Sequence, residues 1–336
     1  MILKTGTKAP PVWMMRQAGR YHSHYQKLRA KHSFMDLCKI PDLASEVALG
    51  PVQDFDFDVS ILFSDILFPL EALGMGLEYT DHGPRLGFQL DQATVGKLVP
   101  WTDALPKLAF QKEAMILTRE KIPSQKKVIG FIGGLWTLFV YAVEGSHAGS
   151  LIKSKQDMAL FQKFAQIMLP LLKENIRIQF EGGADAVMIF DTAAGEVSPA
   201  FYQQWIAPLM AELSKAYPGK LGYYSKGTQR SFFTPEFLAL PWAGMGFDHR
   251  WNLPSILNKT ELSTPGFVQG NFDQALLFLS ADEFEKTYRT YLEGFKKLTP
   301  EQRSNWVCGL GHGVLPKTPE ANVRRFVQIT REVFHE

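Results

Sequence analysis

A chain of 336 residues, with 46% hydrophobic and 21% charged residues, has the composition of a globular protein and could form two ordinary domains or one large α/β barrel. The formal net charge of +2 excludes the strong charge bias of a nucleic-acid-binding or membrane-surface protein, so any anionic ligand must be bound by local basic groups. The two cysteines, Cys38 and Cys308, are too few for a disulfide framework and indicate a reducing, cytoplasmic location. We expect no signal peptide in MILKTGTKAP and no membrane span.

Short apolar runs recur along the whole chain, and each ends at a glycine or a polar residue. They occupy residues 12–15, 59–64, 128–133, 186–190, 221–225, 243–247, 266–270 and 306–311. Near-continuous apolar runs of this length are typical of strands that are buried on both faces of a parallel sheet.

Longer segments with helical spacing lie between several of these runs. Residues 153–183 predict one helix with a kink at Pro170, and residues 198–219 predict a second helix, which Ser-Pro opens and Pro-Gly closes.

Two further helices are predicted towards the end of the chain. Residues 280–298 begin with Ser280 and Glu283, the spacing of a capping box. The last predicted helix lies within residues 317–334, with Thr318 as its N-cap and Pro319 in the first helical position.

Alternation of about eight strand-like runs with helices predicts an α/β fold, and we interpret residues 1–336 as a single (β/α)8 TIM-type barrel. A doubly wound open sheet is the competing arrangement. No linker, low-complexity tract or internal repeat indicates a second domain.

Polar residues follow the predicted strands, and in a barrel the chemistry gathers at these strand ends. They are Arg16, Arg20, Asp65, Asp191, Thr192, Ser225, Lys226, Asp248, Asn271 and His312, with Tyr141 a little downstream of the third run. A pocket that combines arginines, an acid, hydroxyls and a histidine could hold an anion and protect a developing positive charge.

Most of these residues also have an ordinary structural explanation. Arg16 and Arg20 could form surface ion pairs, although two arginines around a glycine favour bidentate binding of a carboxylate. Asp65 could cap a helix, but a carboxylate inside the apolar run ILFSDILF carries a desolvation cost that favours a functional position. Tyr141 could be a core aromatic residue, and Thr192 could cap the helix after its strand.

The histidines and cysteines give no convincing metal site. Cys308 and His312 are four residues apart, and His22 and His24 alternate near the first loop, whereas zinc sites need three or four converging ligands. The glycines beside His312 in GLGHGV instead favour a ligand close to the backbone. The glycine pairs in GGLW and EGGADA match no phosphate-binding or dinucleotide motif, so no nucleotide cofactor is expected.

Several segments, taken in chain order, resemble the uroporphyrinogen decarboxylase family. They are PVWMMRQAGRY, ILFSDIL, TLFVYAVEG, FDTAAG, VQGNFD and GLGHGVLPKTP, and they extend from Pro11 to Pro319. The resemblance implies a (β/α)8 barrel that converts the acetate arms of uroporphyrinogen III to methyl groups, giving coproporphyrinogen III in heme biosynthesis. It also implies that no metal or organic cofactor is used and that the protein is a cytoplasmic homodimer.

The same resemblance assigns the site residues. It implies that substrate is bound by Arg16, Gln17, Ala18, Gly19, Arg20, Asp65, Tyr141, Thr192 and His312, with Asp65, Arg16 and Arg20 as the catalytic residues. The substrate carries eight carboxylates, which explains the concentrated arginine charge. A pyrrole protonated at its α-carbon can take up the electrons of decarboxylation, and Asp65 is predicted to stabilise that cation. The proton donor is left open.

The chain departs from the family pattern at three places: relatives usually have Leu-Pro-Glu at residues 22–24, asparagine at Gly309 and proline at Leu135. These changes put turnover rate and substrate tolerance in question. Two alternatives remain. One is a zinc-dependent methyltransferase of the same barrel superfamily, which needs a His/Cys cluster; the other is a non-catalytic porphyrinogen-binding protein.

Overall fold

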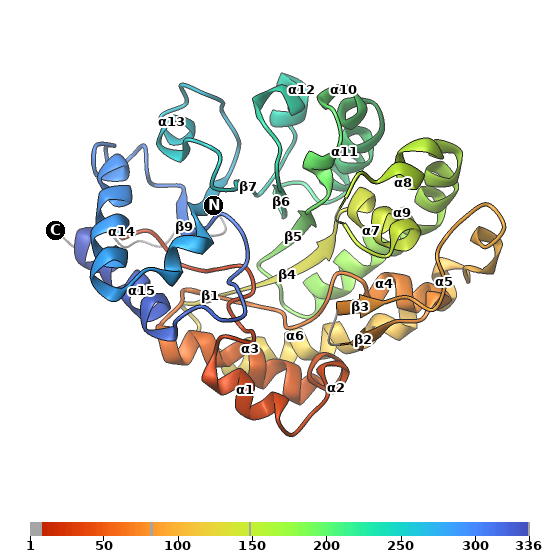
Figure 1. Ribbon diagram of the computed structural model, residues 1–336, viewed down its shortest axis with the longest axis horizontal. Coiled ribbons are helices and arrows are strands. Elements are labelled where there is room, and N and C mark those ends of the chain that lie inside the picture. The colour runs from red at the N-terminus through yellow and green to blue at the C-terminus, as the bar shows by residue number, and fades with distance from the viewer. Residues whose placement is uncertain (1–8, 81–82, 148, 335–336) are drawn as a thin grey trace.

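The computed structural model describes residues 9–80, 83–147 and 149–334 and has a curved parallel sheet at its centre (Figure 1). The order of its seven strands is β1 (Val59–Ile61), β4 (Lys127–Gly133), β5 (Ala186–Asp191), β6 (Leu221–Ser225), β7 (Gly244–Gly246), β8 (Phe267–Phe272) and β9 (Trp306–Leu310). All neighbours in this sheet pair in parallel. Each strand lies within or overlaps a predicted apolar run, because the strands are buried on both faces.

Residues 12–15 were predicted as the first strand, and this prediction is wrong in detail. The segment forms an isolated parallel bridge, between Val12 and Cys308. Side chains replace the regular backbone ladder here: Asp58 Oδ2 accepts the Val12 N–H at 2.7 Å, and Gln17 Oε1 accepts the Met14 N–H at 3.2 Å.

The bridging segment nevertheless joins the two edges of the sheet. On the β9 side, Cys308 N–H donates to the Pro11 carbonyl at 2.8 Å and Trp13 N–H donates to the Cys308 carbonyl at 3.2 Å. On the β1 side, Asp58 N–H donates to the Val12 carbonyl at 2.9 Å. The segment therefore completes the TIM-type α/β fold between β9 and β1.

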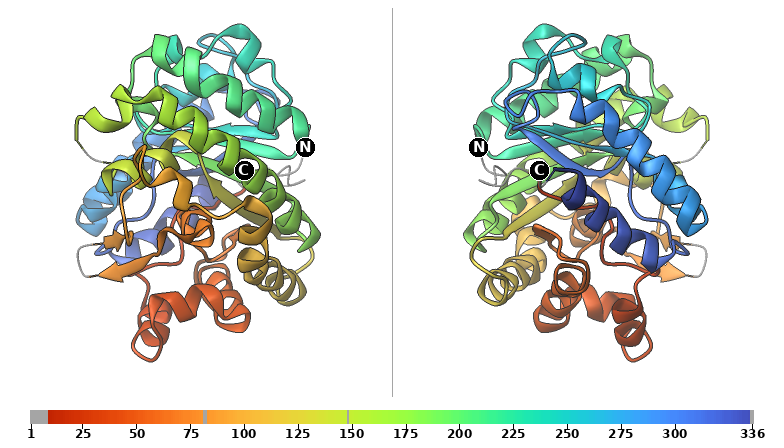
Figure 2. Two further views of the ribbon diagram at one scale, coloured as in Figure 1. Left: turned by 90° about the vertical axis from the view of Figure 1, so that its right-hand side faces the viewer. Right: turned by 90° about the vertical axis from the view of Figure 1, so that its left-hand side faces the viewer.

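The helices of the described residues surround the sheet, as Figure 1 shows. They are α1 (Ser23–Arg29), α2 (Phe34–Lys39), α3 (Pro41–Phe55), α4 (Phe68–Leu70), α5 (Trp101–Ala104), α6 (Ala109–Lys121), α7 (Leu135–Glu144), α8 (Ile152–Gln156), α9 (Met158–Glu181), α10 (Pro199–Phe201), α11 (Ala207–Ala216), α12 (Pro235–Leu238), α13 (Leu253–Leu257), α14 (Ala281–Lys296) and α15 (Glu320–Phe334). Helices α1–α3 lie together at one end of the molecule in both views of Figure 2. Within the described ranges, no helix combines the length and apolarity needed to cross a membrane.

Two predicted helices are interrupted. The segment 153–183 divides into α8 and α9 at Asp157, whose backbone is not helical and whose side chain accepts the Leu160 N–H at 2.9 Å as the N-cap of α9. Pro170 lies inside α9. The segment 198–219 contains α10, a π-helical stretch from Tyr202 to Ile206, and α11.

The predicted caps of the last two helices are not formed. Ser280 precedes α14, but its hydroxyl donates to the Glu283 carboxylate at 2.6 Å and accepts no backbone N–H. Helix α15 begins at Glu320, one residue later than expected, and the Thr318 hydroxyl is buried without a hydrogen-bond partner among the described residues. The Pro319 carbonyl accepts the Asn322 N–H at 3.1 Å in its place.

The substitution Asp58→Ala tests the closing segment. It leaves the Val12 N–H without its charged acceptor and removes one of the two carboxylates that pair with Arg331 on α15, while Asp56 stays in place at 3.1 Å. Because a hydrogen bond to a charged group contributes roughly 1.5–3 kcal/mol, we expect the free energy of unfolding to fall by about 2 kcal/mol, measured by urea denaturation. The control is Asp103→Ala at an exposed carboxylate of α5. Equal losses in the two variants would contradict this account of the closure.

Candidate active site

The loop after Met15 carries both predicted arginines in exposed positions. Arg16 has a positive φ of 58°, a conformation that is costly for a residue other than glycine. No carboxylate of the described residues lies within ion-pair distance of Arg16 or Arg20. The ion-pair reading of these two residues is therefore wrong for the described chain, and both guanidinium groups are available to an anion.

Gln17 holds this loop from inside the protein. Its side chain is fully buried, Nε2 donates to the Val59 carbonyl at 2.8 Å, and Oε1 accepts the Met14 N–H. The Tyr21 hydroxyl donates to the Gln17 carbonyl at 2.7 Å. Since these bonds occupy the amide, Gln17 fixes the loop to the start of β1 in this structure.

The remaining loop residues, Ala18 and Gly19, are small for packing reasons. Ala18 packs against the apolar cluster that includes Tyr25 and Val47. A Cβ added to Gly19 would lie 3.3 Å from the Arg16 carbonyl oxygen. The loop is therefore compact between its two arginines.

The glycines beside His312 allow a second loop to pack against the arginine loop. A Cβ added to Gly313 would lie 2.6 Å from Arg16 Cδ, and Val314 N–H donates to the Met15 carbonyl at 2.9 Å. Arg16 thus lies directly over Gly313, next to His312. These contacts bring together the beginning and the end of the chain.

His312 is held as a neutral ring. It stacks on Tyr224, with ring centroids 6.1 Å apart and planes inclined by 12°. The Tyr224 hydroxyl donates to the Gly311 carbonyl at 2.8 Å and lies 3.2 Å from His312 Nδ1. Burial, together with the charges of Arg16 and Lys226, lowers the pKa of His312 to about 3. At neutral pH the ring can therefore contribute hydrogen bonds without positive charge.

Asp65 lies beyond the end of β1 and is partly exposed. Its Oδ1 accepts the Leu67 N–H at 2.9 Å in a turn, but the helix-cap explanation is wrong, because Leu67 is the N-cap of α4 and that helix has no side-chain cap. Burial raises the pKa of Asp65, while the Leu67 N–H, Tyr79 and the charge of Arg16 oppose the increase. The turn leaves other lone pairs of the carboxylate available, and its negative charge is poorly compensated.

Tyr141 lies within electrostatic range of Asp65, whereas Thr192 is placed only by its position after β5. Burial, with the charge of Asp65, raises the pKa of Tyr141 to about 12, and its hydroxyl lies 2.6 Å from His147 Nδ1. Thr192 follows β5, is partly exposed, and has no hydrogen bond from its hydroxyl to the described residues. The helix-cap explanation does not hold for Thr192, because Ala193 precedes the short helix η4 (Ala194–Glu196).

Asp191 anchors the helix that carries Tyr141. Its carboxylate accepts the Thr137 hydroxyl at 2.5 Å and the Tyr223 hydroxyl at 3.3 Å. A Cβ added to Gly134 would lie 2.5 Å from Asp191 Cγ. These bonds tie the first turn of α7 to the end of β5, one helical turn before Tyr141. Burial raises the pKa of Asp191 to about 6.

Electrostatic interactions show which residues share one site. The charge of Arg16 influences Asp65, Tyr141, His147 and His312. Three other residues of the sequence prediction, Asp65, Tyr141 and His312, therefore lie within electrostatic range of Arg16, as does His147, which the prediction missed. No described interaction ties Arg20 or Thr192 to this group. Lys226, noted only as a residue after a strand, also acts on His147 and His312.

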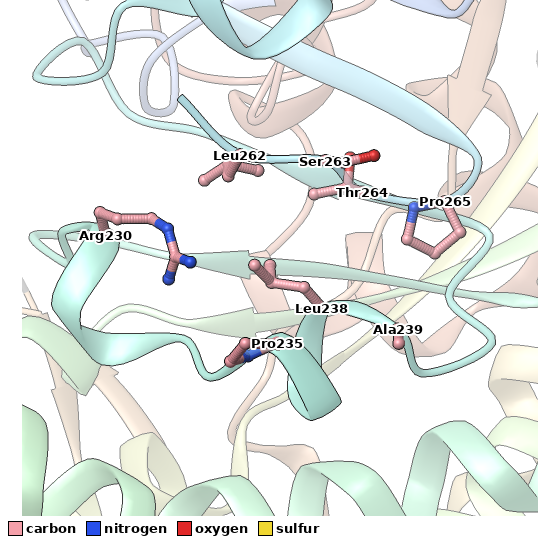
Figure 3. A pocket seen from close by; sticks show the side chains of 8 residues that line it. All are labelled: Arg230, Pro235, Leu238, Ala239, Leu262, Ser263, Thr264 and Pro265. Carbon is pink, nitrogen blue, oxygen red and sulfur yellow. The ribbon is translucent and has the colours of Figure 1, made fainter. Parts of the chain in front are cut away.

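A cleft of about 510 Å³ lies elsewhere (Figure 3). Arg230 and residues of α12 face the segment 262–265 across it. Its lining residues are Arg230, Pro235, Leu238, Ala239, Leu262, Ser263, Thr264 and Pro265, and none of them belongs to the site around Arg16.

Two of the departures from the family pattern, at His22 and Gly309, have structural explanations. His22 is buried and lies 2.7 Å from the Asp54 carboxylate and 3.6 Å from Glu320, so its ring ties α1 to α3 and α15. A Cβ added to Gly309 would lie 2.4 Å from the Trp13 carbonyl oxygen. The closing segment therefore leaves no space for a side chain at residue 309.

The cysteines do not assemble a ligand set. Both are buried, and burial raises the pKa of Cys38 and that of Cys308, the latter to about 12. Cys308 Sγ lies 3.3 Å from the Tyr288 hydroxyl. Within residues 9–80, 83–147 and 149–334, no group of three His, Cys, Asp or Glu side chains is placed to hold a metal ion. The zinc-dependent alternative therefore gains no ligand set from the described chain.

Comparisons with known proteins place the chain in a family. The family model described as uroporphyrinogen decarboxylase (URO-D) matches residues 1–333. The uroporphyrinogen decarboxylase of Chlorobium phaeobacteroides is 33% identical, with 96% of this chain and 93% of the relative covered. The uroporphyrinogen decarboxylase of Myxococcus xanthus is 36% identical, with 94% of this chain and 90% of the relative covered. The chain belongs to the uroporphyrinogen decarboxylase family and is a carboxy-lyase, which confirms the resemblance seen in the sequence.

Solved structures share the fold. A methyltransferase from Methanosarcina mazei has a TM-score of 0.75 at 19% identity, with 99% of this chain and 97% of that chain covered. A B12-independent methionine synthase from Shewanella sp. W3-18-1 has a TM-score of 0.53 at 12% identity, with 98% and 97% covered. At these identities the likeness concerns the fold alone, and it supports the predicted TIM-type class.

The substitution Asp191→Asn tests the anchor of α7 through pH. Because the pKa rises from 3.8 to about 6 on folding, the contribution of Asp191 to stability is fully present below pH 4 and is lost as the pH rises through 6. The neutral amide can still accept the Thr137 hydroxyl. Between pH 4 and 7, the unfolding free energy of the variant should therefore increase relative to native by on the order of 3 kcal/mol.

Denaturant unfolding at several pH values measures this difference. Asp103→Asn, at an exposed carboxylate, is the matched control and should track the native protein at every pH. A difference between Asp191→Asn and native that stays constant across this range would show that the buried charge is not the cause.

Proposed function

We propose that the protein removes the four acetate carboxyl groups of uroporphyrinogen III as carbon dioxide and gives coproporphyrinogen III in heme biosynthesis. The family match over residues 1–333 and the names of the relatives support the substrate class. The observation that carries the proposal is the unpaired Arg16 guanidinium, which acts on Asp65, Tyr141 and the neutral His312.

Substrate binding depends on the two arginines. The substrate has eight carboxylates, and Arg16 and Arg20 offer planar forks that form charge-assisted, bidentate hydrogen bonds. Since neither guanidinium has an ion-pair partner among the described residues, no protein carboxylate has to be displaced. His312, Tyr141 and Thr192 add neutral donors and acceptors for the acetate and propionate arms.

The pyrrole ring provides the electron sink for each decarboxylation. A proton added to the pyrrole α-carbon makes the ring a cation, which accepts the electron pair of the breaking C–C bond as carbon dioxide leaves. The exocyclic methylene then takes up a proton to become methyl, and the α-carbon releases its proton. Each round replaces one carboxylate with one proton, so the proposed reaction needs neither a metal nor an organic cofactor.

Asp65 is the proposed charge partner of this cation. Burial raises the pKa of Asp65, which means that its negative charge is poorly stabilised in the free protein. A cationic pyrrole would supply the missing compensation in the transition state, where it lowers the barrier. The carboxylate can also accept hydrogen bonds from pyrrole N–H groups and so orient the macrocycle.

The resemblance also supports one barrel per chain and a cytoplasmic homodimer as the working form. The mass of the native particle, compared with 37.9 kDa for the chain, is the measurement that decides the dimer.

The substitution Asp65→Asn tests the reaction and the role of the acid together. The purified protein is incubated with uroporphyrinogen III without oxygen and without added cofactor, and the products are oxidised and separated by carboxylate number. We expect stepwise loss from eight carboxylates to four in the native protein. The variant should lose at least about 100-fold in kcat, because the amide keeps the turn to Leu67 but carries no charge.

Asp103→Asn is the control and should match the native protein. Turnover in Asp65→Asn within a few-fold of native would keep the reaction and exclude Asp65 as the charge partner. If the native protein binds the substrate tightly but releases no carbon dioxide, the porphyrinogen-binding alternative is favoured.

A further inference from the structure

His147 occupies a position that the proposed reaction does not yet use. Gly145, with a φ of 81°, ends α7, and the chain then turns back so that His147 lies over Tyr141. Nδ1 of His147 is 2.6 Å from the Tyr141 hydroxyl, and the two ring centroids are 5.3 Å apart. The histidine ring is half-buried.

The charged groups around His147 come from several elements of the site. Lys226 follows β6, Arg16 belongs to the first loop, and both influence the ring, as does Glu196 after β5. His147 in turn acts on His312 after β9. His147 thus contacts Tyr141 and lies within electrostatic range of Arg16 and Lys226, two cations that have no ion-pair partner among the described residues.

The hydrogen bond to Tyr141 couples the tyrosine hydroxyl to the tautomer of the ring: when the hydroxyl donates, Nδ1 accepts. Burial raises the pKa of Tyr141 to about 12, so its hydroxyl keeps its hydrogen, and His147 Nδ1 is its hydrogen-bond partner among the described residues. Burial and the charges of Lys226 and Arg16 lower the pKa of His147, so the ring is neutral. A neutral ring that accepts through Nδ1 carries its hydrogen on Nε2.

We propose that His147 is a further substrate-binding residue: Tyr141 fixes the ring through Nδ1, and Nε2–H donates to a carboxylate arm of the substrate. This inference rests on the proposed function. A carboxylate attracted by Arg16 and Lys226 would find a fixed donor within electrostatic range of both cations. Because the ring is neutral, it adds this hydrogen bond without further repulsion between the neighbouring cations.

Two substitutions separate the donor from the bulk of the ring. His147→Leu removes the donor but keeps an apolar side chain, and we expect KM for uroporphyrinogen III to rise about tenfold with kcat within about twofold of native. His147→Gln restores an N–H donor near the Nε2 position and should recover KM to within about threefold. His32→Ala, in the turn between α1 and α2, is the control.

A second measurement reads the ring directly. In ¹⁵N-labelled protein, NMR correlation of the histidine ring nitrogens should show His147 protonated at Nε2, and Tyr141→Phe should mix the two tautomers. A ring protonated at Nδ1 in the native protein would overturn the proposal. This readout does not depend on turnover.

The outcomes also distinguish this inference from the proposed function. No decarboxylation by the native protein would overturn the proposed function, and with it this inference. Decarboxylation by the native protein, with KM unchanged in His147→Leu, would overturn the inference alone. If His147→Leu and His147→Gln lose activity equally, and mainly through a lower kcat, the ring only supports Tyr141 and the inference is overturned.

Discussion

The hydrogen bonds that hold Val12 between β9 and Asp58 determine where the first arginine leaves the barrel. If the segment were a longer strand, its ladder would continue past Met15 and move the turn at Arg16. Gln17 ends the segment by accepting the Met14 N–H and donating to β1. The position of Arg16, and with it the charge environment of the whole site, therefore depends on a side-chain substitute for backbone pairing.

The charged groups of the site have no salt bridges within the described residues, although the chain as a whole is close to neutral. Arg16 has no carboxylate partner in the described chain, and Asp65 is a partly buried acid without a salt bridge. His312 is neutral because burial and nearby cations oppose its protonation. A ligand that carries many carboxylates and a transient positive charge would satisfy both kinds of group.

Sequence reasoning found those parts of the fold that depend on burial. The seven strands were predictable because both faces of each strand are buried, and Asp65 was noticeable because a carboxylate interrupts an apolar run. Residues 12–15 differ because side chains from outside this segment replace the backbone hydrogen bonds of a strand. Asp58 accepts the Val12 N–H, and Gln17 accepts the Met14 N–H.

The missed parts depend on how the backbone turns. His147 enters the site only because the chain reverses after Gly145, and nothing in the local sequence marks that return. Thr318 has the right residue type for a cap, but its hydroxyl is buried away from any partner among the described residues. Burial patterns can be predicted from residue type, whereas loop direction and hydroxyl orientation require the packed neighbours.

The contact between residues 11–13 and Cys308 joins two segments that are almost 300 positions apart in the sequence. During synthesis on a ribosome, the arginine loop emerges first but cannot reach its final place until β9 has also emerged. Until then the first strand edge is open, and long-range closure of this kind is slow compared with local helix formation. A nascent chain that stops before residue 306 would contain the arginine loop but lack the contacts to Cys308 that fix its position.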